Sequence, residues 1–342
     1  MLVILADDLT GALDTAAPFA ARGLHVEVAL SLSAIAEALS ETPAVLSINL
    51  ASREIGVDAA RRAAAAALAA LPADIRLFKK VDSRLKGHIA AELDALSYRA
   101  SLVAPAIPSF GRIVADGCVT GFGVDAPISI AEKLGSHGVR ATVPDIAAQS
   151  EMSLWLERAD EMGVDLLVGA RGLAEALAER MSGQAPVRAA EIPAGRGLFV
   201  IGSRDPITLA QIAALRGVGE LRYLPAPNGE LAGVRADDSA LTLVQAVPGE
   251  GTASPEDVSR ALAESVCPVL TDAASTLLLS GGATAEAVLK RMGIVRFRLL
   301  GECLPGLGLA HAGGRCIIAK SGGFGQPETL REIAGRLLGK TG

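Results

Sequence analysis

Short apolar runs alternate with segments of helical spacing along most of the chain, and this alternation limits the fold more than any other feature. In the first half, the apolar runs cover residues 2–6, 26–30, 44–50, 75–80, 101–104 and 165–168. Helical spacing fills the intervals, over residues 11–22, 58–71, 89–96, 152–162 and 173–181. Strands that alternate with helices form parallel sheets whose buried strands are apolar throughout. We therefore predict repeated β-α-β units.

A second series of the same kind begins at residue 198. Its expected strands cover residues 198–201, 220–224, 241–244, 277–279, 297–300 and 316–319, and its expected helices cover residues 206–216, 283–292 and 328–338. A further helix should begin after Ser254, because Ser caps helices and Pro255 suits the first helical position. Residues 183–197 separate the two series, since they have no periodicity and contain two prolines and three glycines.

These patterns predict an α/β protein made of two three-layer domains with mostly parallel sheets and a cleft between them. A length of 342 residues agrees with this, because one domain usually takes ~150 residues. We place an N-terminal domain at residues 1–190 and a C-terminal domain at residues 197–342.

Composition excludes several classes of partner. A net charge of −6 and an aromatic content of 3% disfavour nucleic acid, which is bound by basic surfaces and stacked rings. No apolar run approaches the ~18 residues of a membrane span. The four cysteines form no C-x-x-C pair and no basic leader precedes the first strand, so we expect a cytoplasmic protein with reduced thiols. The histidines lack metal-ligand spacing, so we predict no zinc site.

Polar residues directly follow the first strand of the series. Ligands of open α/β sheets bind beyond the carboxyl ends of the strands, and here Asp7 and Asp8 precede Thr10 and Gly11. Adjacent carboxylates with a hydroxyl can hold Mg²⁺ or the hydroxyl groups of a polyol. The alternative is an ordinary helix cap, with the acids placed favourably on the helix dipole.

Two further positions in the first half favour an anionic ligand. Residues 79–88 (KKVDSRLKGH) place several cations around Asp82 and Ser83, although a solvated basic turn would look similar. Residues 105–144 read as a functional loop rich in Gly and Pro. Within this loop Arg112 follows Gly111, where it could hold a carboxylate through two hydrogen bonds.

Three glycine-bearing turns end three strands of the second half. They are residues 202–204 (GSR), 280–284 (SGGAT) and 320–325 (KSGGFG). Such turns can bind phosphates through backbone N–H groups, although glycines also serve ordinary turns. Residues 335–341 resemble a P-loop but are one residue too short. Residues 306–311 begin like the dinucleotide-binding motif of dehydrogenases but end in His311. A dehydrogenase is therefore disfavoured.

Taken in order along the chain, these motifs resemble the four-carbon acid sugar kinase family, which includes threonate, erythronate and 3-oxo-tetronate kinases. The resemblance rests on ILADDLTGALD (4–14), KKVDSRLKGH (79–88), PAIPSFGR (105–112), GS (202–203), SGGAT (280–284) and KSGGFG (320–325). It implies ATP-dependent phosphorylation of a terminal hydroxyl group on a small sugar acid. The N-terminal domain would bind the acid, and the C-terminal domain would bind ATP.

The resemblance also implies roles for individual residues. The nucleotide would contact Ser203, Gly281, Gly282, Ala283, Thr284, Gly322, Gly323 and Gly325, and the sugar acid would contact Asp8, Lys80, Asp82 and Arg112. We add Asp7, Ser83 and Lys86 on the substrate side because they stand in the same motifs.

Phosphoryl transfer further needs Mg²⁺, cations and a carboxylate that accepts the hydroxyl proton. Asp8 and Asp82 are the candidates for this base. We prefer Asp8, because Lys79, Lys80, Arg84 and Lys86 surround Asp82 in the sequence and make it the poorer proton acceptor.

One alternative function stays open at this point, a catalytically inactive two-domain sensor that binds a sugar acid or a nucleotide. It draws on two departures from the family pattern, Ala283 where relatives commonly carry an acid and Lys86-Gly87-His88 where Arg-Gly-Asn is frequent. The sequence also leaves a homodimer open and does not specify the substrate stereoisomer.

Overall fold

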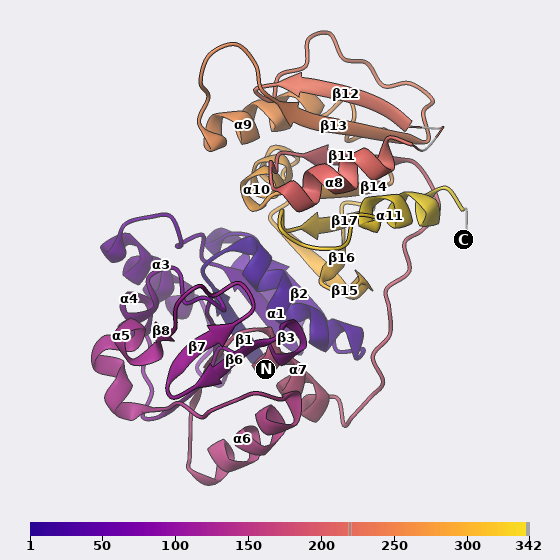
Figure 1. The fold of residues 1–342 in the computed structure, drawn as a ribbon. Coiled ribbons are helices and arrows are strands. Elements are labelled where there is room, and N and C mark those ends of the chain that lie inside the picture. The colour runs from indigo at the N-terminus through magenta and orange to yellow at the C-terminus, as the bar shows by residue number, and fades with distance from the viewer. Residues whose placement is uncertain (218, 220, 340–342) are drawn as a thin grey trace. The chain divides into compact units, whose positions relative to one another are not determined.

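The computed structural model describes residues 1–217, 219 and 221–339. The chain forms two compact units, Met1–Arg188 and Ala189–Gly342. In Figure 1 the colour runs along the chain from indigo at the start of the first unit to yellow at the end of the second. The division between them falls inside the aperiodic segment 183–197.

The sheet of the N-terminal unit is parallel throughout. Its strands lie in the order β2 (Val26–Ala29), β3 (Val45–Asn49), β1 (Leu2–Ala6), β4 (Arg76–Lys80), β10 (Leu166–Gly169), β5 (Ser101–Ala104) and β9 (Ala141–Thr142). β1 lies inside the sheet, and its Leu2 pairs with Val45 of β3 on one side and Arg76 of β4 on the other. The prediction of a mostly parallel sheet is confirmed for this unit.

Helices cover both faces of this sheet. α1 (Leu9–Ala21) packs against α7 (Arg171–Met181), which packs against α6 (Gln149–Glu161), while α3 (Val57–Ala69) packs against α4 (Ile89–Leu93). The chain first moves from β1 to β2 through α1, and later it crosses in the other direction from β3 to β4 through α3. Because crossovers between parallel strands are right-handed, this reversal puts α1 and α3 on opposite faces. The short α2 (Ile35–Ser40) contacts β2 and β3.

Regular structure occurs in residues 105–144, where the sequence predicts only loop. An antiparallel sheet contains β6 (Arg112–Ala115), β7 (Cys118–Gly121) and β8 (Ile128–Ser129), and the short α5 (Ile130–Leu134) follows. The prediction of loop is wrong here because these strands are two to four residues long, too short for an alternating pattern to emerge. A tight turn at Asp116 and Gly117, both with positive φ, joins β6 to β7.

The sheet of the C-terminal unit is mixed. Its strands lie in the order β12 (Leu221–Pro227), β13 (Leu241–Val247), β11 (Gly197–Ile201), β14 (Thr276–Ser280), β17 (Arg315–Lys320), β16 (Leu307–Ala312) and β15 (Arg296–Leu304). Pairing is parallel from β12 to β17 and antiparallel from β17 to β15. Residues 306–311, the incomplete dinucleotide fingerprint, form a turn and most of β16. Glu220, the expected first residue of β12, lies outside the described residues.

Two helix pairs pack in the C-terminal unit. α8 (Pro206–Leu215) contacts α11 (Thr329–Leu337), and α9 (Pro255–Val266) contacts α10 (Gly282–Arg291). Ser254 caps α9 by accepting a hydrogen bond from Asp257 N, as predicted. Between the sheet and the first pair lies a continuous core, which includes Phe199, Ile201, Leu330 and Ile333. Each such side chain stabilises the fold by ~1.5–3 kcal/mol when fully buried.

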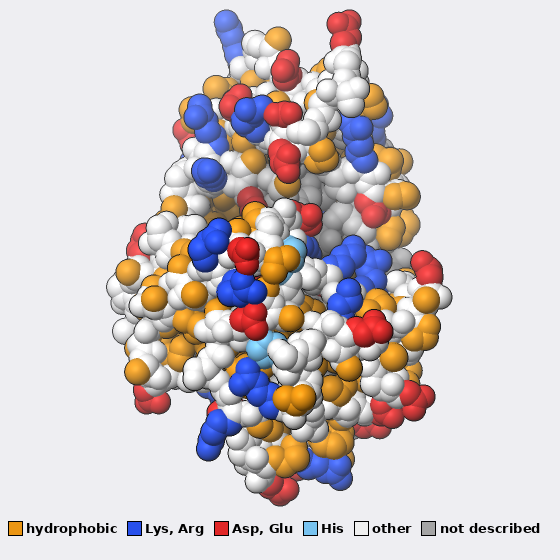
Figure 2. Space-filling model, turned by 90° about the vertical axis from the view of Figure 1, so that its left-hand side faces the viewer, with side chains coloured by type: hydrophobic (Ala, Val, Ile, Leu, Met, Phe, Trp, Pro, Cys, Tyr) orange, Lys and Arg blue, Asp and Glu red, His pale blue; other side chains and the backbone are white. Residues whose placement is uncertain are grey.

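The distribution of charged side chains on the surface and the polarity of the helices concern two partners that the composition disfavours, nucleic acid and the membrane. In Figure 2, Lys and Arg side chains are interspersed with Asp and Glu side chains over most of the visible face. Within the described residues, every helix is too short or too polar to cross a bilayer.

Candidate active site

The first group of candidate residues collects at the carboxyl ends of three neighbouring strands. Asp7 and Asp8 follow β1, Arg53 follows β3, and Asp82 follows β4. β1 lies between β3 and β4, and all three run parallel, so their ends meet at one edge of the sheet. The chain changes direction at β1, which makes this edge a topological switch point of the kind where α/β proteins bind ligands.

Arg53 connects the three carboxylates, and sequence reasoning missed it. Its Nε and Nη2 donate to the two oxygens of Asp7 at 2.8 and 2.9 Å, and its Nη1 donates to Asp8 Oδ2 at 2.5 Å. The Nη2 also lies 4.0 Å from Asp82 Oδ2. The only signal in the sequence was an arginine shortly after the apolar run at 44–50. Its carboxylate partners are far away along the chain, because Asp7 and Asp8 lie 45 or more residues before Arg53 and Asp82 lies 29 residues after it.

Asp8 is both a helix cap and a member of this cluster. As the N-cap of α1 it accepts hydrogen bonds from Gly11 N at 2.7 Å and Thr10 Oγ1 at 2.8 Å. A Cβ on Gly11 would lie 2.6 Å from Asp8 Oδ1 and 3.0 Å from Lys80 Nζ. The buried Lys80 therefore brings its ammonium group to the same cap, and Gly11 is required by the close approach of both side chains.

Electrostatics keep Asp7 ionised in this cluster. Burial alone raises the pKa of Asp7, but the hydrogen bonds from Arg53 and the charges of Lys79 and Lys80 outweigh burial, so the pKa lies below its usual value. Burial likewise disfavours the charged form of Arg53, yet its hydrogen bonds with Asp7 and the charge of Asp8 raise the pKa of Arg53 above its ordinary range. The cluster is a fixed arrangement of opposite charges.

Lys79 does not face Asp82, which corrects one step of the sequence reasoning. Its Nζ lies 2.6 Å from Glu92 Oε2 in a fully buried ion pair, and it donates to the carbonyls of Leu5 and Lys80 at 3.2 and 2.7 Å. Successive residues of a strand point to opposite faces, so Lys79 and Lys80 leave β4 on opposite sides, and Lys79 acts on Asp7 only through its charge. Lys79 is a structural residue beneath the site.

Arg112 and Ser83 are brought together. Arg112 Nη1 donates to Ser83 Oγ at 2.5 Å, while Nε and Nη2 donate to the carbonyl of Phe122 at 3.1 and 2.8 Å. Burial, followed by the nearby charge of Arg84, lowers the pKa of Arg112, but a guanidinium remains charged throughout the physiological range. The β6–β7 hairpin thus carries Arg112 to the residue next to Asp82.

The remaining residues of the 79–88 motif are arranged differently. Gly87 has a φ of +87°, and a Cβ there would lie 2.7 Å from Asp7 Oδ2. Asp82 accepts a hydrogen bond from Arg84 N at 2.9 Å. Lys86 is exposed and forms no hydrogen bond or ion pair with another described residue, so the structure leaves its predicted role open.

The second group of candidate residues lies at the carboxyl ends of β11, β14 and β17. These strands are adjacent and parallel, so the turns at 202–204, 280–284 and 320–325 meet at one edge. Gly202 N donates to Ser280 O and Gly281 N donates to Lys320 O, both at 3.0 Å. Backbone hydrogen bonds therefore hold the three turns together, as their positions after three strands predict.

Close packing explains why glycine occupies two of these positions. A Cβ on Gly322 would lie 2.3 Å from Ser203 Oγ, so a larger residue there would force the Ser203 side chain to move. Gly281 has a φ of +104°, a backbone conformation that L-residues rarely adopt. A Cβ on Gly281 would also lie 3.6 Å from Ser203 N, so Ser203 lies against both of the other turns. Gly325 has a φ of +94°, and a Cβ there would lie 2.7 Å from Thr329 Oγ1, so it packs against the start of α11, and its predicted contact with the nucleotide stays a prediction.

Unpaired backbone donors gather at this edge. The N–H groups of Gly322 and Gly323 have no hydrogen-bond partner among the described residues. Gly282, Ala283 and Thr284 form the first turn of α10, where backbone N–H groups lack helical acceptors. Such donors, together with the positive end of the helix dipole, favour a bound anion. Ala283 offers this donor set only its backbone N–H group, so an alanine in place of an acid at this position leaves the donor set unchanged.

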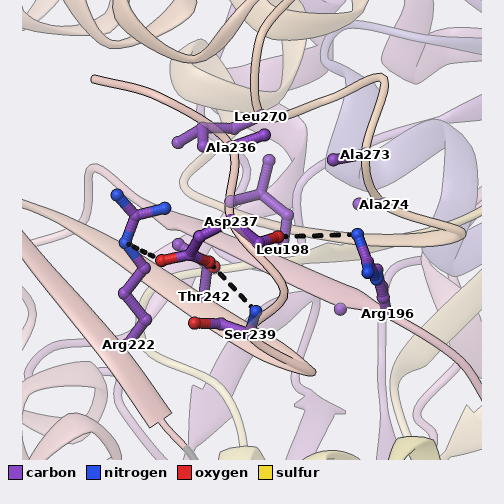
Figure 3. A pocket seen from close by; sticks show the side chains of 11 residues that line it. Arg196, Leu198, Arg222, Ala236, Asp237, Ser239, Thr242, Leu270, Ala273 and Ala274 are labelled. Carbon is purple, nitrogen blue, oxygen red and sulfur yellow. Dashed lines mark hydrogen bonds and ion pairs between the residues drawn. The ribbon is translucent and has the colours of Figure 1, made fainter. Parts of the chain in front are cut away.

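A cavity of about 20 Å³ lies at the opposite, amino ends of the C-terminal strands (Figure 3). Arg222 Nε lies 3.1 Å from Asp237 Oδ2, and Arg196 Nη2 donates to Asp238 Oδ1 at 2.8 Å. Both arginines are therefore neutralised by neighbouring carboxylates, and the volume suits little more than one water molecule. This cavity is not a candidate for binding a nucleotide.

Comparison with known proteins gives two family matches. A family described as a sugar-binding N-terminal domain matches residues 2–127, and one described as a nucleotide-binding C-terminal domain matches residues 232–330. The D-threonate kinase of Cupriavidus necator is 29% identical, with 96% of each chain covered. The 3-oxo-tetronate kinase of Methylobacterium radiotolerans is 26% identical, with 94% of this chain and 95% of the relative covered.

A solved structure shows the same fold. A Salmonella typhimurium LT2 protein superposes with a TM-score of 0.77 at 18% identity, with 98% of each chain covered.

Proposed function

The chain belongs to the four-carbon acid sugar kinase family, and from that premise we propose that it transfers the terminal phosphate of ATP to a terminal hydroxyl group of a four-carbon sugar acid. The N-terminal unit binds the acid through charged side chains. The C-terminal unit binds ATP through its backbone turns.

The convergence of three turns at the ends of β11, β14 and β17 is the observation that carries this proposal. The turns present the unpaired N–H groups of Gly322 and Gly323 beside the first turn of α10. A triphosphate satisfies such donors without any cationic side chain. A Cβ at Gly322 would lie 2.3 Å from Ser203 Oγ, so the turn at 320–325 packs directly against the turn at 202–204.

In the N-terminal unit, Arg112 and Lys80 bind the carboxylate of the sugar acid. Asp8 and Asp82 then remain to orient the hydroxyl groups and accept a proton. Asp8 already accepts three hydrogen bonds, from Gly11, Thr10 and Arg53. Asp82 accepts one, from Arg84 N, and its second oxygen lies 4.0 Å from Arg53. Since Asp82 retains more lone pairs for a substrate, we now favour Asp82 as the base and Asp8 as an orienting ligand.

Transfer itself needs little covalent help from the protein. The hydroxyl oxygen attacks the γ-phosphorus, the bond from that phosphorus to the bridging oxygen breaks, ADP leaves, and the hydroxyl proton passes to the carboxylate. Mg²⁺ neutralises the phosphates when it is bound. The described residues contain no group of three His, Cys, Asp or Glu side chains able to hold a metal, so Mg²⁺ would enter with ATP, held largely by phosphate oxygens and water.

D-threonate is the substrate that we propose first. The proposal draws on the full-length relatives, which act on D-threonate and 3-oxo-tetronate by name. Either compound has a carboxylate for Arg112 and hydroxyl groups for Asp8 and Asp82. The two differ at carbon 3, where one carries a hydroxyl group and the other a ketone, so a hydrogen bond to that position decides between them.

A steady-state assay tests the proposed function. The full chain would be incubated with Mg-ATP and each of D-threonate, L-threonate, D-erythronate and 3-oxo-tetronate, and ADP release would be followed. We expect ADP release that depends on the sugar acid and is fastest with D-threonate. Saturable binding of ATP and acid without ADP release would instead identify the inactive sensor, and no binding of either ligand would refute both proposals.

A further inference from the structure

Lys320 ends β17 inside the nucleotide-binding edge, yet its ammonium group is fully used by the protein. The side chain is 1% exposed. Its Nζ donates to Thr208 Oγ1 at 3.1 Å, to Ser321 O at 2.9 Å and to Gly322 O at 3.1 Å. An ammonium group has three N–H donors, so none remains for a phosphate. Lys320 therefore differs from a lysine that reaches out to its nucleotide.

These hydrogen bonds determine how the turn at 320–325 presents its backbone. The carbonyls of Ser321 and Gly322 point toward Lys320 Nζ. In a planar trans peptide the N–H group points opposite to the carbonyl, so the N–H groups of Gly322 and Gly323 point away from Lys320. Thr208 supports this orientation from α8, because its hydroxyl donates to Gly322 O at 2.6 Å.

We propose that Lys320 and Thr208 are positioning residues, which orient the Gly322 and Gly323 N–H groups toward the nucleotide phosphates and couple phosphate binding to the charge of Lys320. The proposal rests on the nucleotide-binding role of this edge. Neither residue touches the nucleotide, and both act through the turn.

The protonation of Lys320 is the property that makes this coupling measurable. Burial lowers the pKa of Lys320 to about 8, with a partial offset from the carboxylate of Asp205 at the N-cap of α8. From the other elements around it, Thr208 and the turn residues Ser321 and Gly322 offer only uncharged groups. A bound polyphosphate adds negative charge nearby and raises the pKa of Lys320. Nucleotide binding should therefore take up a proton when the pH exceeds about 8.

Calorimetric titration of the full chain with ADP tests this inference. Titrations from about pH 6.5 to about pH 9.5, in pairs of buffers with different ionisation enthalpies, count the protons taken up on binding. For the wild-type chain we expect affinity to fall above about pH 8 together with proton uptake. Lys320→Met should weaken ADP binding roughly 10- to 100-fold at neutral pH, since charged hydrogen bonds are lost, and should abolish the proton uptake.

A second pair of variants leaves the lysine in place. Thr208→Val removes the hydroxyl group at nearly constant volume and should weaken ADP binding roughly 5- to 10-fold. Thr208→Ser keeps the hydroxyl group and should bind nearly as the wild type. Thermal unfolding of each variant shows that it is folded. A merely structural role would lower the melting temperature without changing the number of protons bound.

Three results would contradict the inference in different ways. If the wild type binds ADP without pH-linked proton uptake, phosphate binding is not coupled to the charge of Lys320. If folded Lys320→Met, or Thr208→Val, binds ADP as tightly as the wild type, the two residues do not position the turn. If the wild type binds no ADP at any pH, the nucleotide-binding proposal fails and this inference fails with it.

Discussion

The two units place their candidate sites at equivalent positions but build them from different groups. In both, the site lies at the carboxyl ends of three adjacent parallel strands, β3-β1-β4 in one and β11-β14-β17 in the other. In the N-terminal unit the ends carry charged side chains, with Arg53 binding Asp7 and Asp8. In the C-terminal unit they carry turns rich in glycine, in which Lys320 is turned inward and Arg204 is exposed.

This difference follows from the ligands proposed for the two sites. A small sugar acid presents a carboxylate and several hydroxyl groups, which need donors and acceptors in defined directions, and side chains provide both. A polyphosphate presents only acceptors, which backbone N–H groups satisfy without an added charge. We therefore expect the N-terminal site to be sensitive to loss of charge and the C-terminal site to be sensitive to added volume.

The largest effect should come from removing one carboxylate charge in the N-terminal unit. We expect Asp82→Asn to lower kcat by ~10²–10⁴ with little change in KM, as for loss of a general base. Asp8→Asn should mainly raise the KM for the sugar acid, because Asn still caps the helix but binds Arg53 more weakly. ADP affinity should be unchanged in both. A normal kcat for Asp82→Asn would return the role of base to Asp8.

Arg112 offers the next largest effect. Arg112→Ala should raise the KM for the sugar acid by roughly 10- to 100-fold, the usual cost of a lost charged hydrogen bond, and leave the KM for ATP unchanged. Arg112→Lys should restore the affinity only in part, because an ammonium group cannot form the same pair of hydrogen bonds. Arg99→Ala is a matched control, since Arg99 is exposed and pairs with Asp165. Equal losses for both substrates would remove Arg112 from the acid site.

Added volume tests the C-terminal side of the comparison. Gly322→Ala places a methyl group 2.3 Å from Ser203 Oγ, and overpacking of this kind costs ~1–3 kcal/mol. The KM for ATP should rise by roughly 5- to 100-fold, with the KM for the acid unchanged. Gly56→Ala, where a Cβ meets no atom within 4 Å, is the control. Adding Ser203→Ala to Gly322→Ala removes the crowded hydroxyl group and should recover part of the affinity, when compared with Ser203→Ala alone. Failure to do so would point to a different contact.

The smallest effect is on stability and depends on pH. Because the pKa of Asp7 is lowered in the folded chain, its ionisation stabilises the fold above its unfolded pKa of 3.8, and this contribution is lost as pH falls through the folded pKa. At neutral pH Asp7→Asn should lower the free energy of unfolding by ~1–2 kcal/mol. Chemical denaturation should show this difference shrinking below about pH 4. A difference that stays constant with pH would mean that Asp7 contributes through packing alone.

Local signals were sufficient for most of the fold. Apolar runs and helical spacing predicted the alternating elements of both units, and strand 2–6 and strand 101–104 have the predicted bounds. The small antiparallel sheet at Arg112–Ser129 and the strand Leu307–Ala312 were missed. Strands this short, or interrupted by glycine, are stabilised by pairing with neighbours, and pairing leaves no periodic pattern in the chain itself.

The candidate sites divide in the same way. The sequence by itself determined which residues stand at the strand ends, because a run of buried apolar residues must stop where polar groups begin, and it placed Asp7, Asp8, Asp82 and the three glycine turns there. Only the tertiary structure decided which of these groups meet. It showed that Arg53 forms ion pairs with Asp7 and Asp8. It also showed that Lys79 forms an ion pair with Glu92 and that Lys320 donates to the backbone of the turn that follows it. Such partners depend on the order of the strands in the sheet and on the face of the sheet to which each side chain points, and neither can be predicted from the spacing of residues along the chain.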